Sequence, residues 1–187
     1  MNCFACGKPI YNPNVNCPHC GYRFTVDDNR YSYRVTDLPA SINPTTAAIL
    51  IQEIKGYLKD TSEVLDAFCG TSTMLIERSF AKSYKSLTGI DISEDAISYS
   101  MINANNVPLK INLVCENILK YQGPEFDEII SNMPFGNRVS NHELNITLYK
   151  RFIASIDKML KPNGMAFLLT SEIALMKELI NKNKILD

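Results

Sequence analysis

The sequence lacks the features that would identify a secreted, membrane-bound or strongly basic protein. Nineteen basic and 20 acidic side chains leave a net charge of −1, so no global basic field attracts nucleic acid. No apolar run reaches the roughly 18 residues of a membrane-spanning helix, and the N-terminus has no signal-peptide pattern. We therefore predict a soluble, cytoplasmic protein with no membrane partner. Its 187 residues, 45% of them hydrophobic, suffice for one α/β domain and a small appendage.

Histidine is also scarce, since the chain has only two, and this favours chemistry that needs no histidine base. A candidate follows the apolar stretch at 126–131, where the sequence reads Asn132-Met133-Pro134-Phe135. The Asn132 side-chain oxygen and the Met133 carbonyl can accept hydrogen bonds from a planar amine, because Pro134 restricts the backbone. Phe135 can stack on the ring that carries this amine. These four residues are our candidate catalytic loop, and a loop without any catalytic role is the alternative.

Cysteine is concentrated at the N-terminus, where four of the six cysteines lie within the first 20 residues. They form two Cys-x2-Cys pairs, each followed by glycine: Cys3 and Cys6, then Cys17 and Cys20. Two thiolates on one tight turn reach the same ion, so two such pairs predict a tetrahedral, structural Zn²⁺ site. Two disulfides are the alternative, which a cytoplasmic location disfavours. We predict a zinc ribbon over 1–28 that depends on the metal for its folding.

Positive charge is concentrated in the same part of the chain. Residues 1–36 carry four basic and two acidic side chains, whereas the remainder carries 15 basic and 18 acidic ones. Aromatic residues lie between the basic ones, and this mixture is typical of a nucleic-acid contact surface. A small aromatic core with solvated charges is the alternative. The residues concerned are Lys8, Tyr11, Tyr22, Arg23, Phe24, Arg30, Tyr31, Tyr33 and Arg34.

From residue 38 onward the pattern of apolar residues predicts alternating helices and strands. We expect helices over 47–58, 74–81, 93–105, 145–160 and 173–181, and strands over 63–68, 87–91, 111–115, 126–131 and 165–170. This alternation predicts an α/β fold with a Rossmann-like, doubly wound parallel sheet. We assign 29–42 to a linker and 43–187 to this domain.

Polar residues recur where the predicted strands end, which is the edge at which such sheets bind ligands. Asp66 and Asp91 end the first two strands, and Asn117 follows the third. The loop at 69–73 reads Cys-Gly-Thr-Ser-Thr rather than Gly-x-Gly-x-x-Gly, so it lacks the pyrophosphate cradle of a dinucleotide site. A nucleoside without phosphates fits better, and S-adenosylmethionine is the common one. Asp66 or the loop would meet its methionyl part, Asp91 the ribose and Asn117 the adenine amine.

Several blocks of the sequence, in this order, closely resemble class I, Rossmann-like RNA methyltransferases that usually carry a THUMP domain, including tRNA guanine-N2 methyltransferases. The blocks are LPASINPTTAA at 38–48, DAFCGTSTMLIE at 66–77, GID at 89–91, SNMPFG at 131–136 and LYKRF at 148–152. The resemblance implies S-adenosylmethionine as methyl donor and an RNA substrate, with tRNA as the first candidate. It also implies methylation of an exocyclic amine, guanine N2 first, at the Asn132 loop.

With this resemblance we expect a cofactor site built largely from the strand ends and their loops. Ile92 and Ile118 would flank the adenine ring, or serve as ordinary core. The family's RNA-capturing THUMP domain is absent, and the zinc module occupies its place. The candidate cofactor-binding residues are Asn43, Thr45, Asp66, Phe68, Gly70, Thr71, Thr73, Asp91, Ile92, Asn117 and Ile118.

The sequence departs from this family at four points. Ser72 replaces a loop glycine, so its side chain must point away from the ligand. Asn117 replaces an acid but can still accept through its oxygen, and Met133 replaces a proline, which relaxes the loop but keeps the carbonyl. The chain stops near Leu186, where a sixth strand would begin, so we expect strands 6 and 7 to be missing. The sheet edge is then exposed, or a protein partner covers it.

Two other functions stay open at this point. One is methylation of adenine N6 in RNA or DNA, because Asn-Pro-Pro-aromatic loops serve both amines. The other is a non-catalytic or partner-dependent protein that binds S-adenosylmethionine or RNA through an altered site.

Overall fold

The computed structural model describes residues 31–39, 41–107, 109–134 and 142–183. The chain divides into two compact units, Met1–Ser32 and Tyr33–Asp187, and the fold described below is that of the second. The predicted zinc ribbon, with Cys3, Cys6, Cys17 and Cys20, lies outside the described residues, as do Phe135 and the start of a sixth strand. None of the helices in the described part of the chain is long and apolar enough to cross a bilayer.

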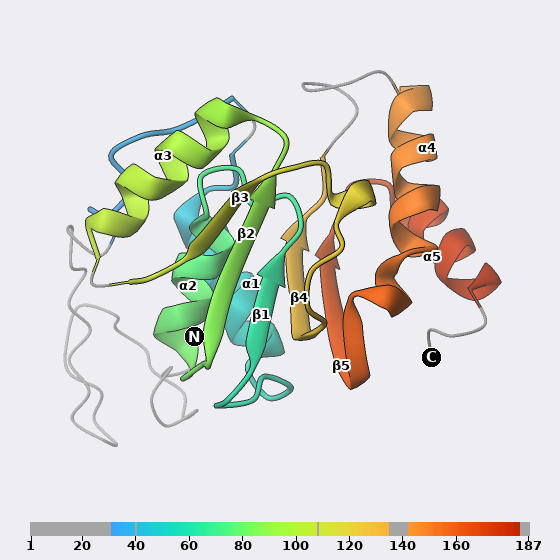
Figure 1. The fold of residues 1–187 in the computed structure, drawn as a ribbon, viewed down its shortest axis with the longest axis horizontal. Coiled ribbons are helices and arrows are strands. Elements are labelled where there is room, and N and C mark those ends of the chain that lie inside the picture. Colours follow the sequence, from blue (N-terminus) through green and yellow to red (C-terminus); the bar gives the residue numbers. More distant parts are fainter. Residues whose placement is uncertain (1–30, 40, 108, 135–141, 184–187) are drawn as a thin grey trace, which may run out of the picture. The chain divides into compact units, whose positions relative to one another are not determined.

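Helices and strands alternate along the second unit (Figure 1). The strands are β1 (Glu63–Asp66), β2 (Ser86–Asp91), β3 (Asn112–Cys115), β4 (Phe126–Asn132) and β5 (Leu160–Leu169). The α-helices are α1 (Pro44–Ile54), α2 (Thr73–Ala81), α3 (Glu94–Asn105), α4 (His142–Ile153) and α5 (Ile173–Lys182). Two short 3₁₀ helices, η1 (Ile118–Lys120) and η2 (Ile156–Lys158), follow β3 and α4.

The five strands form one parallel sheet in the order β3-β2-β1-β4-β5, which confirms the predicted Rossmann-like fold. The chain builds outward from β1 to β3 and then returns to place β4 on the other side of β1. Ligands of such sheets bind where the strand order reverses, beyond the carboxyl ends of the strands. The reversal lies here between β1 and β4, which places the ends of these two strands, Asp66 and Asn132, beside one crevice.

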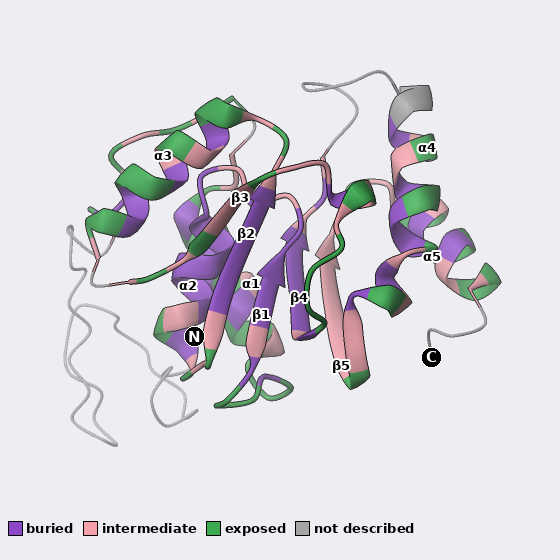
Figure 2. Cartoon of the chain, viewed as in Figure 1, coloured by how far each residue is buried: buried purple, intermediate pink, exposed green. Residues whose placement is uncertain are grey.

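Two apolar cores cover the two faces of the sheet. Ala47 and Ile51 of α1 and Leu75 of α2 pack with Val64 and Ile130 on one face. On the other face Tyr149 and Phe152 of α4 and Leu179 of α5 pack with Leu65 and Ile129. Neighbouring residues of one strand thus point to opposite faces, as the two-residue period of a strand requires. Figure 2 shows the result, since β1, β2 and β4 are largely buried and the edge strands β3 and β5 are more exposed.

The helix starts follow capping chemistry that is visible in the sequence. Asn43 precedes α1, and its side chain accepts a hydrogen bond from the Thr45 backbone N–H, with Pro44 at the first helical position. Ser93 caps α3 in the same way by accepting from the Ala96 N–H at 3.3 Å. These caps hold the helix starts beside the strand ends that precede them.

The predicted boundaries were wrong by three or more residues at both ends of α1, at both ends of α4 and at the start of β5. Helix α1 ends at Ile54 rather than at 58, and α4 ends at Ile153 rather than at 160 because the chain continues into η2. Strand β5 begins at Leu160, before the predicted turn. Its pairing with β4 shifts, because Phe126 pairs with Leu160 and Glu128 already pairs with Met165. The intervening residues 161–164 form a bulge in which Asn163 has a φ of +62°, so the turn interrupts the strand instead of preceding it.

Candidate functional site

A pocket opens at the carboxyl ends of β1 and β4, at the reversal of strand order. It encloses about 620 Å³ of empty space, including its open mouth. It brings together the end of β1, the loop that follows it and the end of β4, together with residues that precede α1. Its lining residues are Leu38, Pro39, Ser41, Ile42, Asp66, Phe68, Cys69, Gly70, Thr71, Thr73, Met74, Asn132, Met133 and Pro134.

Asp66 is the buried carboxylate of this pocket, with 1% of its surface exposed. Its Oδ1 accepts hydrogen bonds from the Ser131 hydroxyl at 2.8 Å and from the Phe68 N–H at 3.2 Å. Burial raises the pKa of Asp66 to about 7, against the opposing effect of these two hydrogen bonds. The Ser131 hydroxyl in turn accepts from the Ala67 N–H at 2.7 Å, so it joins the acid of β1 to the residue before Asn132.

The loop after β1 turns sharply at two residues in the left-handed backbone region. Gly70 has a φ of +52° and Ser72 a φ of +61°, a conformation that favours glycine. The Ser72 hydroxyl donates to the Ser100 hydroxyl of α3 at 2.9 Å, and Ser100 donates to the Gly70 carbonyl at 2.7 Å. As predicted, the Ser72 side chain lies away from the pocket. Its hydrogen bond to Ser100 stabilises the left-handed turn that a glycine would adopt without such a bond.

Asp91 lies at the end of β2, next to this loop. Its Oδ2 accepts the Gly70 N–H at 2.9 Å and its Oδ1 accepts the Ser93 N–H at 3.0 Å. Asn117 lies just beyond β3, and its side-chain oxygen accepts the Leu119 N–H at 3.0 Å as the cap of η1. Ile92 is 71% exposed, whereas Ile118 is buried in the core with α4 and α5. None of these four residues lines the pocket, so they form a separate stretch along the ends of β2 and β3.

Asn132 ends β4 inside the pocket, and its side-chain oxygen is buried with no hydrogen-bond partner among the described residues. Such an acceptor costs stability unless a partner satisfies it. Met133 and Pro134 follow along the pocket wall, and the Met133 side chain is fully buried. Among the described residues, this pocket residue therefore carries a buried acceptor without a donor.

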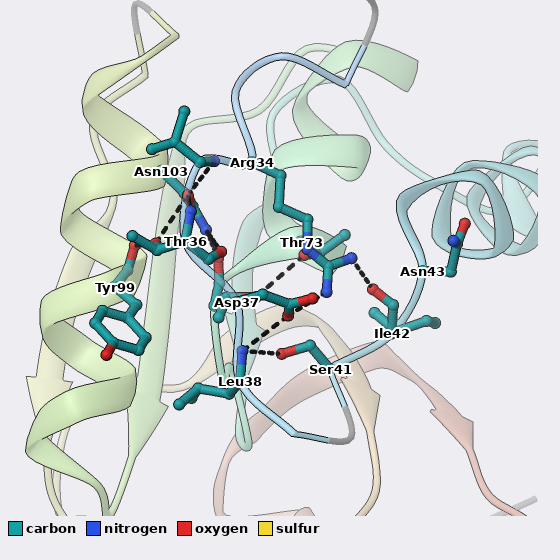
Figure 3. A network of polar contacts seen from close by, with 12 residues as sticks. Arg34, Thr36, Asp37, Leu38, Ser41, Ile42, Asn43, Thr73, Tyr99 and Asn103 are labelled. Atoms are coloured by element: carbon teal, nitrogen blue, oxygen red, sulfur yellow. Dashed lines mark hydrogen bonds and ion pairs between the residues drawn. The ribbon is translucent and has the colours of Figure 1, made fainter.

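One wall of the pocket comes from a segment that we assigned to a linker. Asn103 of α3 is fully buried, and its Oδ1 accepts the Val35 and Thr36 N–H groups, both at 3.1 Å (Figure 3). Its amide group donates to the Thr36 carbonyl at 3.1 Å and to the Thr71 carbonyl of the loop after β1 at 3.4 Å. Asn103 thus ties residues 35–36, just ahead of the lining residues 38–42, to the glycine loop. Its place within a helix gave no sequence signal for this contact.

Two residues that we assigned to a nucleic-acid contact surface, Tyr33 and Arg34, have largely buried side chains instead. The Arg34 side chain is only 10% exposed, pairs with Asp37 and donates to the Ile42 carbonyl at 2.5 Å, so it braces the pocket wall. Tyr33 is buried, and its hydroxyl donates to Glu77 of α2 at 2.7 Å. For these two residues that prediction was wrong, because both side chains are largely buried in the unit that begins at Tyr33. The other residues of that surface lie outside the described chain, apart from Tyr31.

The structure does not bring every candidate cofactor residue to the pocket. Phe68, Gly70, Thr71 and Thr73 line it together with Asp66. Asn43 and Thr45 are exposed at the start of α1, next to the lining residue Ile42, and Figure 3 shows the Asn43 side chain apart from the network around Arg34.

This sheet order, with acids at the ends of β1 and β2 and an Asn-x-Pro loop after β4, is the architecture of a class I, Rossmann-like methyltransferase. More particularly, the chain belongs to the UPF0020 family, described as the RMKL-like methyltransferase domain, which it matches over residues 31–186.

Curated and solved relatives agree with this family. The chain is 24% identical to a tRNA (guanine(6)-N2)-methyltransferase of Methanocaldococcus jannaschii over 83% of its own length and 51% of the relative's. It is 29% identical to the U6 snRNA (guanine-N(2))-methyltransferase THUMPD2 of Bos taurus over 62% of its own length and 23% of the relative's. The crystal structure of TrmN from Thermus thermophilus aligns with a TM-score of 0.68 and 25% identity, over 81% of this chain and 44% of that one. The chain thus spans about half or less of these proteins.

Proposed function

We propose that this chain is an S-adenosylmethionine-dependent RNA methyltransferase that modifies an exocyclic base amine, with N2 of a tRNA guanine as the first candidate. The observation that carries the proposal is the Asn132 side-chain oxygen, a buried acceptor without a partner among the described residues, in a pocket beside Asp66 and the glycine loop. An exocyclic amine supplies the hydrogen-bond donor that this oxygen requires. The names of the archaeal and bovine relatives, both guanine-N2 methyltransferases acting on RNA, support the same assignment.

The residues around the pocket fit the cofactor. We assign its methionyl part to Asp66 and the loop with Gly70, whose positive φ turns the backbone sharply where it lines the pocket. Asp91 and Asn117 would hold the ribose and the adenine amine, with Ile92 and Ile118 near the ring. Asp91 uses one lone pair of each oxygen on a backbone N–H, which leaves the others to accept hydroxyl groups. When bound, S-adenosylmethionine supplies a methyl group on a sulfonium centre.

The chain's own part in the reaction is to position and polarise the amine. Asn132 Oδ1 and the Met133 carbonyl each accept one N–H, which holds the nitrogen pyramidal and directs its lone pair toward the cofactor side of the pocket. Phe135, outside the described residues, would stack on the base. The nitrogen would gain a bond to the methyl carbon as the bond from that carbon to sulfur breaks, so that the sulfur leaves as a neutral thioether. The extra proton on the nitrogen would then pass to water, so no side chain has to act as a base. Positioning of the two reactants then supplies most of the rate enhancement.

Replacing Asn132 tests this role directly. Asn132→Ala removes the acceptor, so we expect methyl transfer to bulk tRNA to fall about 100-fold or more while cofactor affinity is retained. Asn132→Asp keeps an acceptor oxygen of the same size and should retain more activity. Transfer is measured with labelled S-adenosylmethionine and bulk tRNA, then rRNA, followed by nucleoside mass spectrometry, and cofactor affinity by calorimetry. Wild-type turnover by Asn132→Ala would contradict the mechanism, and N6-methyladenosine as product would move the target from guanine to adenine.

We also propose a structural Zn²⁺ bound by Cys3, Cys6, Cys17 and Cys20. The support is the spacing of two Cys-x2-Cys pairs in a separate compact unit, Met1–Ser32. The same unit carries Lys8, Arg23 and Arg30, and we assign capture of the RNA to it. A protein partner at the β5 edge of the sheet and a cytoplasmic location stay predictions.

A further inference from the structure

The loop after β4 is held by a backbone hydrogen bond that the related proline-containing loops cannot form. The Met133 N–H donates to the Leu169 carbonyl of β5 at 2.9 Å. Asn132 and Leu169 are the last paired residues of the two strands, so this bond extends the pairing by one residue of β4. A proline at 133 has no N–H and would leave this carbonyl without its donor. The Met133 side chain adds a second anchor, because it is fully buried in the same core as Tyr149 and Phe152.

The next residue of the loop is held from α4. The Tyr149 hydroxyl donates to the Pro134 carbonyl at 2.9 Å and lies 3.1 Å from the Thr170 hydroxyl. The Pro134 carbonyl can only accept, so Tyr149 donates to it and its oxygen accepts the Thr170 proton. Thr170 in turn accepts the Glu172 N–H at 2.9 Å. Each donor is therefore assigned, and the chain of hydrogen bonds runs in one direction from the start of α5 to the loop.

The burial of Tyr149 suits it for this contact. Its side chain is fully buried in the core on the α4 face, so the hydroxyl position is fixed by packing. Burial also raises the pKa of Tyr149, with a smaller opposing effect from Thr170, so the hydroxyl keeps its proton at neutral pH. A buried hydrogen bond of this kind restricts the carbonyl in both distance and direction.

We propose that Tyr149 is a positioning residue of the methyltransferase site. Through its hydrogen bonds to Thr170 and Pro134 it holds the backbone that carries Asn132 and the Met133 carbonyl. The inference rests on the proposed function for its catalytic consequence, but the anchoring of the loop can be measured without catalysis.

The kinetic test removes one oxygen atom. Tyr149→Phe should lower kcat for methyl transfer about 10- to 100-fold, because a misplaced acceptor spoils the alignment of the reactants. The calorimetric Kd for S-adenosylmethionine should stay within about twofold, since Tyr149 does not line the pocket. Thr170→Val, which cannot donate, should show part of the loss, and Thr170→Ser, which can, should restore kcat. Tyr33→Phe is the matched control, because it removes the hydroxyl of another buried tyrosine. That hydroxyl donates to Glu77 at 2.7 Å and lies far from Tyr149 in the sequence.

The second test reads the loop itself by hydrogen exchange of the Met133 amide. Tyr149→Phe should speed its exchange at least about tenfold relative to the amides of β1, whereas Tyr33→Phe should not. Unchanged exchange together with unchanged kcat would overturn the positioning role, as would a kcat loss of equal size in Tyr33→Phe. If the wild-type protein transfers no methyl group to any RNA, the proposed function fails, and the exchange experiment still decides whether Tyr149 holds the loop.

Discussion

At the scale of single residues, the pocket concentrates polar groups in an apolar surrounding. Asp66 and the Asn132 oxygen are both buried, and the Ser131 hydroxyl joins the strands that carry them. Ser131 stabilises the charged form of Asp66, whereas burial favours the neutral form and dominates. The cofactor-free protein therefore holds an acid that changes its charge close to neutral pH.

This shift predicts how stability depends on pH. The unfolded chain releases the Asp66 proton near pH 3.8 and the native protein near pH 7, so the native state binds more protons between these values. The contribution of Asp66 to stability is therefore full below pH 3.8, falls as the pH rises through this window and is lost above pH 7. The total loss in unfolding free energy is on the order of 4 kcal/mol. Asp66→Asn lacks this dependence.

Urea unfolding of cofactor-free wild type and Asp66→Asn at pH 4 to 8 measures the difference. The stability of the variant relative to wild type should increase with pH. Glu63→Gln is the control of opposite sign, because the ion pair with Lys161 lowers the pKa of Glu63 and its contribution is lost as the pH falls. Parallel pH profiles for wild type and Asp66→Asn would show that Asp66 titrates normally in the folded protein.

Residue types at strand ends were readable from sequence, but their geometry was not. Asp66, Gly70 and Asn132, which line one pocket, were predicted as site residues because small and polar residues at the ends of apolar strands have few structural reasons to occur there. The anchors Tyr149, Ser131 and Asn103 were missed, since a buried hydroxyl or amide within a regular element looks like any other residue. Their partners lie 15 to 67 residues away along the chain, at Pro134, Asp66 and Thr36.

At the scale of elements, the segment that enters the domain is joined to the sheet through α3. Asn103 holds Val35 and Thr36 on one side and the loop carbonyl of Thr71 on the other. The same helix supplies Ser100, which holds the Gly70 carbonyl. Helix α3 thus positions both the glycine loop and residues 35–36, which lead into the pocket wall.

Removal of the Asn103 side chain should loosen both the glycine loop and residues 35–36. Asn103→Ala leaves the partly buried Val35 and Thr36 N–H groups without this acceptor, so we expect a loss of about 1 to 3 kcal/mol in unfolding free energy, and weaker binding of S-adenosylmethionine. Asn105→Ala is the matched control, since it makes the same change at an exposed position of the same helix and should alter stability by about 0.5 kcal/mol or less. Urea unfolding and calorimetry measure the two effects. Equal behaviour of the two variants would contradict the role of Asn103.

At the scale of the whole molecule, the alternation of helices and strands predicted the sheet, because strand and helix periods are local properties. The boundary between the two units was harder to predict. Residues 33–38 read as linker, since they are polar and short of apolar periodicity, yet their backbone is bound by α3. A long-range contact made by the backbone produces no periodic pattern of apolar residues in the sequence.

The two compact units also predict how metal loss should act. If the four thiolates form one site as proposed, purified protein should contain one Zn²⁺ per chain by elemental analysis, and Cys17→Ser combined with Cys20→Ser should remove it. Both cores of the sheet lie within Tyr33–Asp187, so the double variant should keep the affinity for S-adenosylmethionine and the unfolding transition of this unit. Its KM for RNA should rise at least about tenfold, because the unit that carries Lys8, Arg23 and Arg30 loses its fold.

The control for zinc content is Cys115→Ser, which changes an exposed free thiol outside the N-terminal unit and should leave the metal in place. Zinc-free wild-type protein that methylates RNA normally would exclude both the metal site and its role in capture. Weaker cofactor binding in the double variant would instead show that the N-terminal unit supports the pocket, since the pocket residues themselves all lie between Leu38 and Pro134.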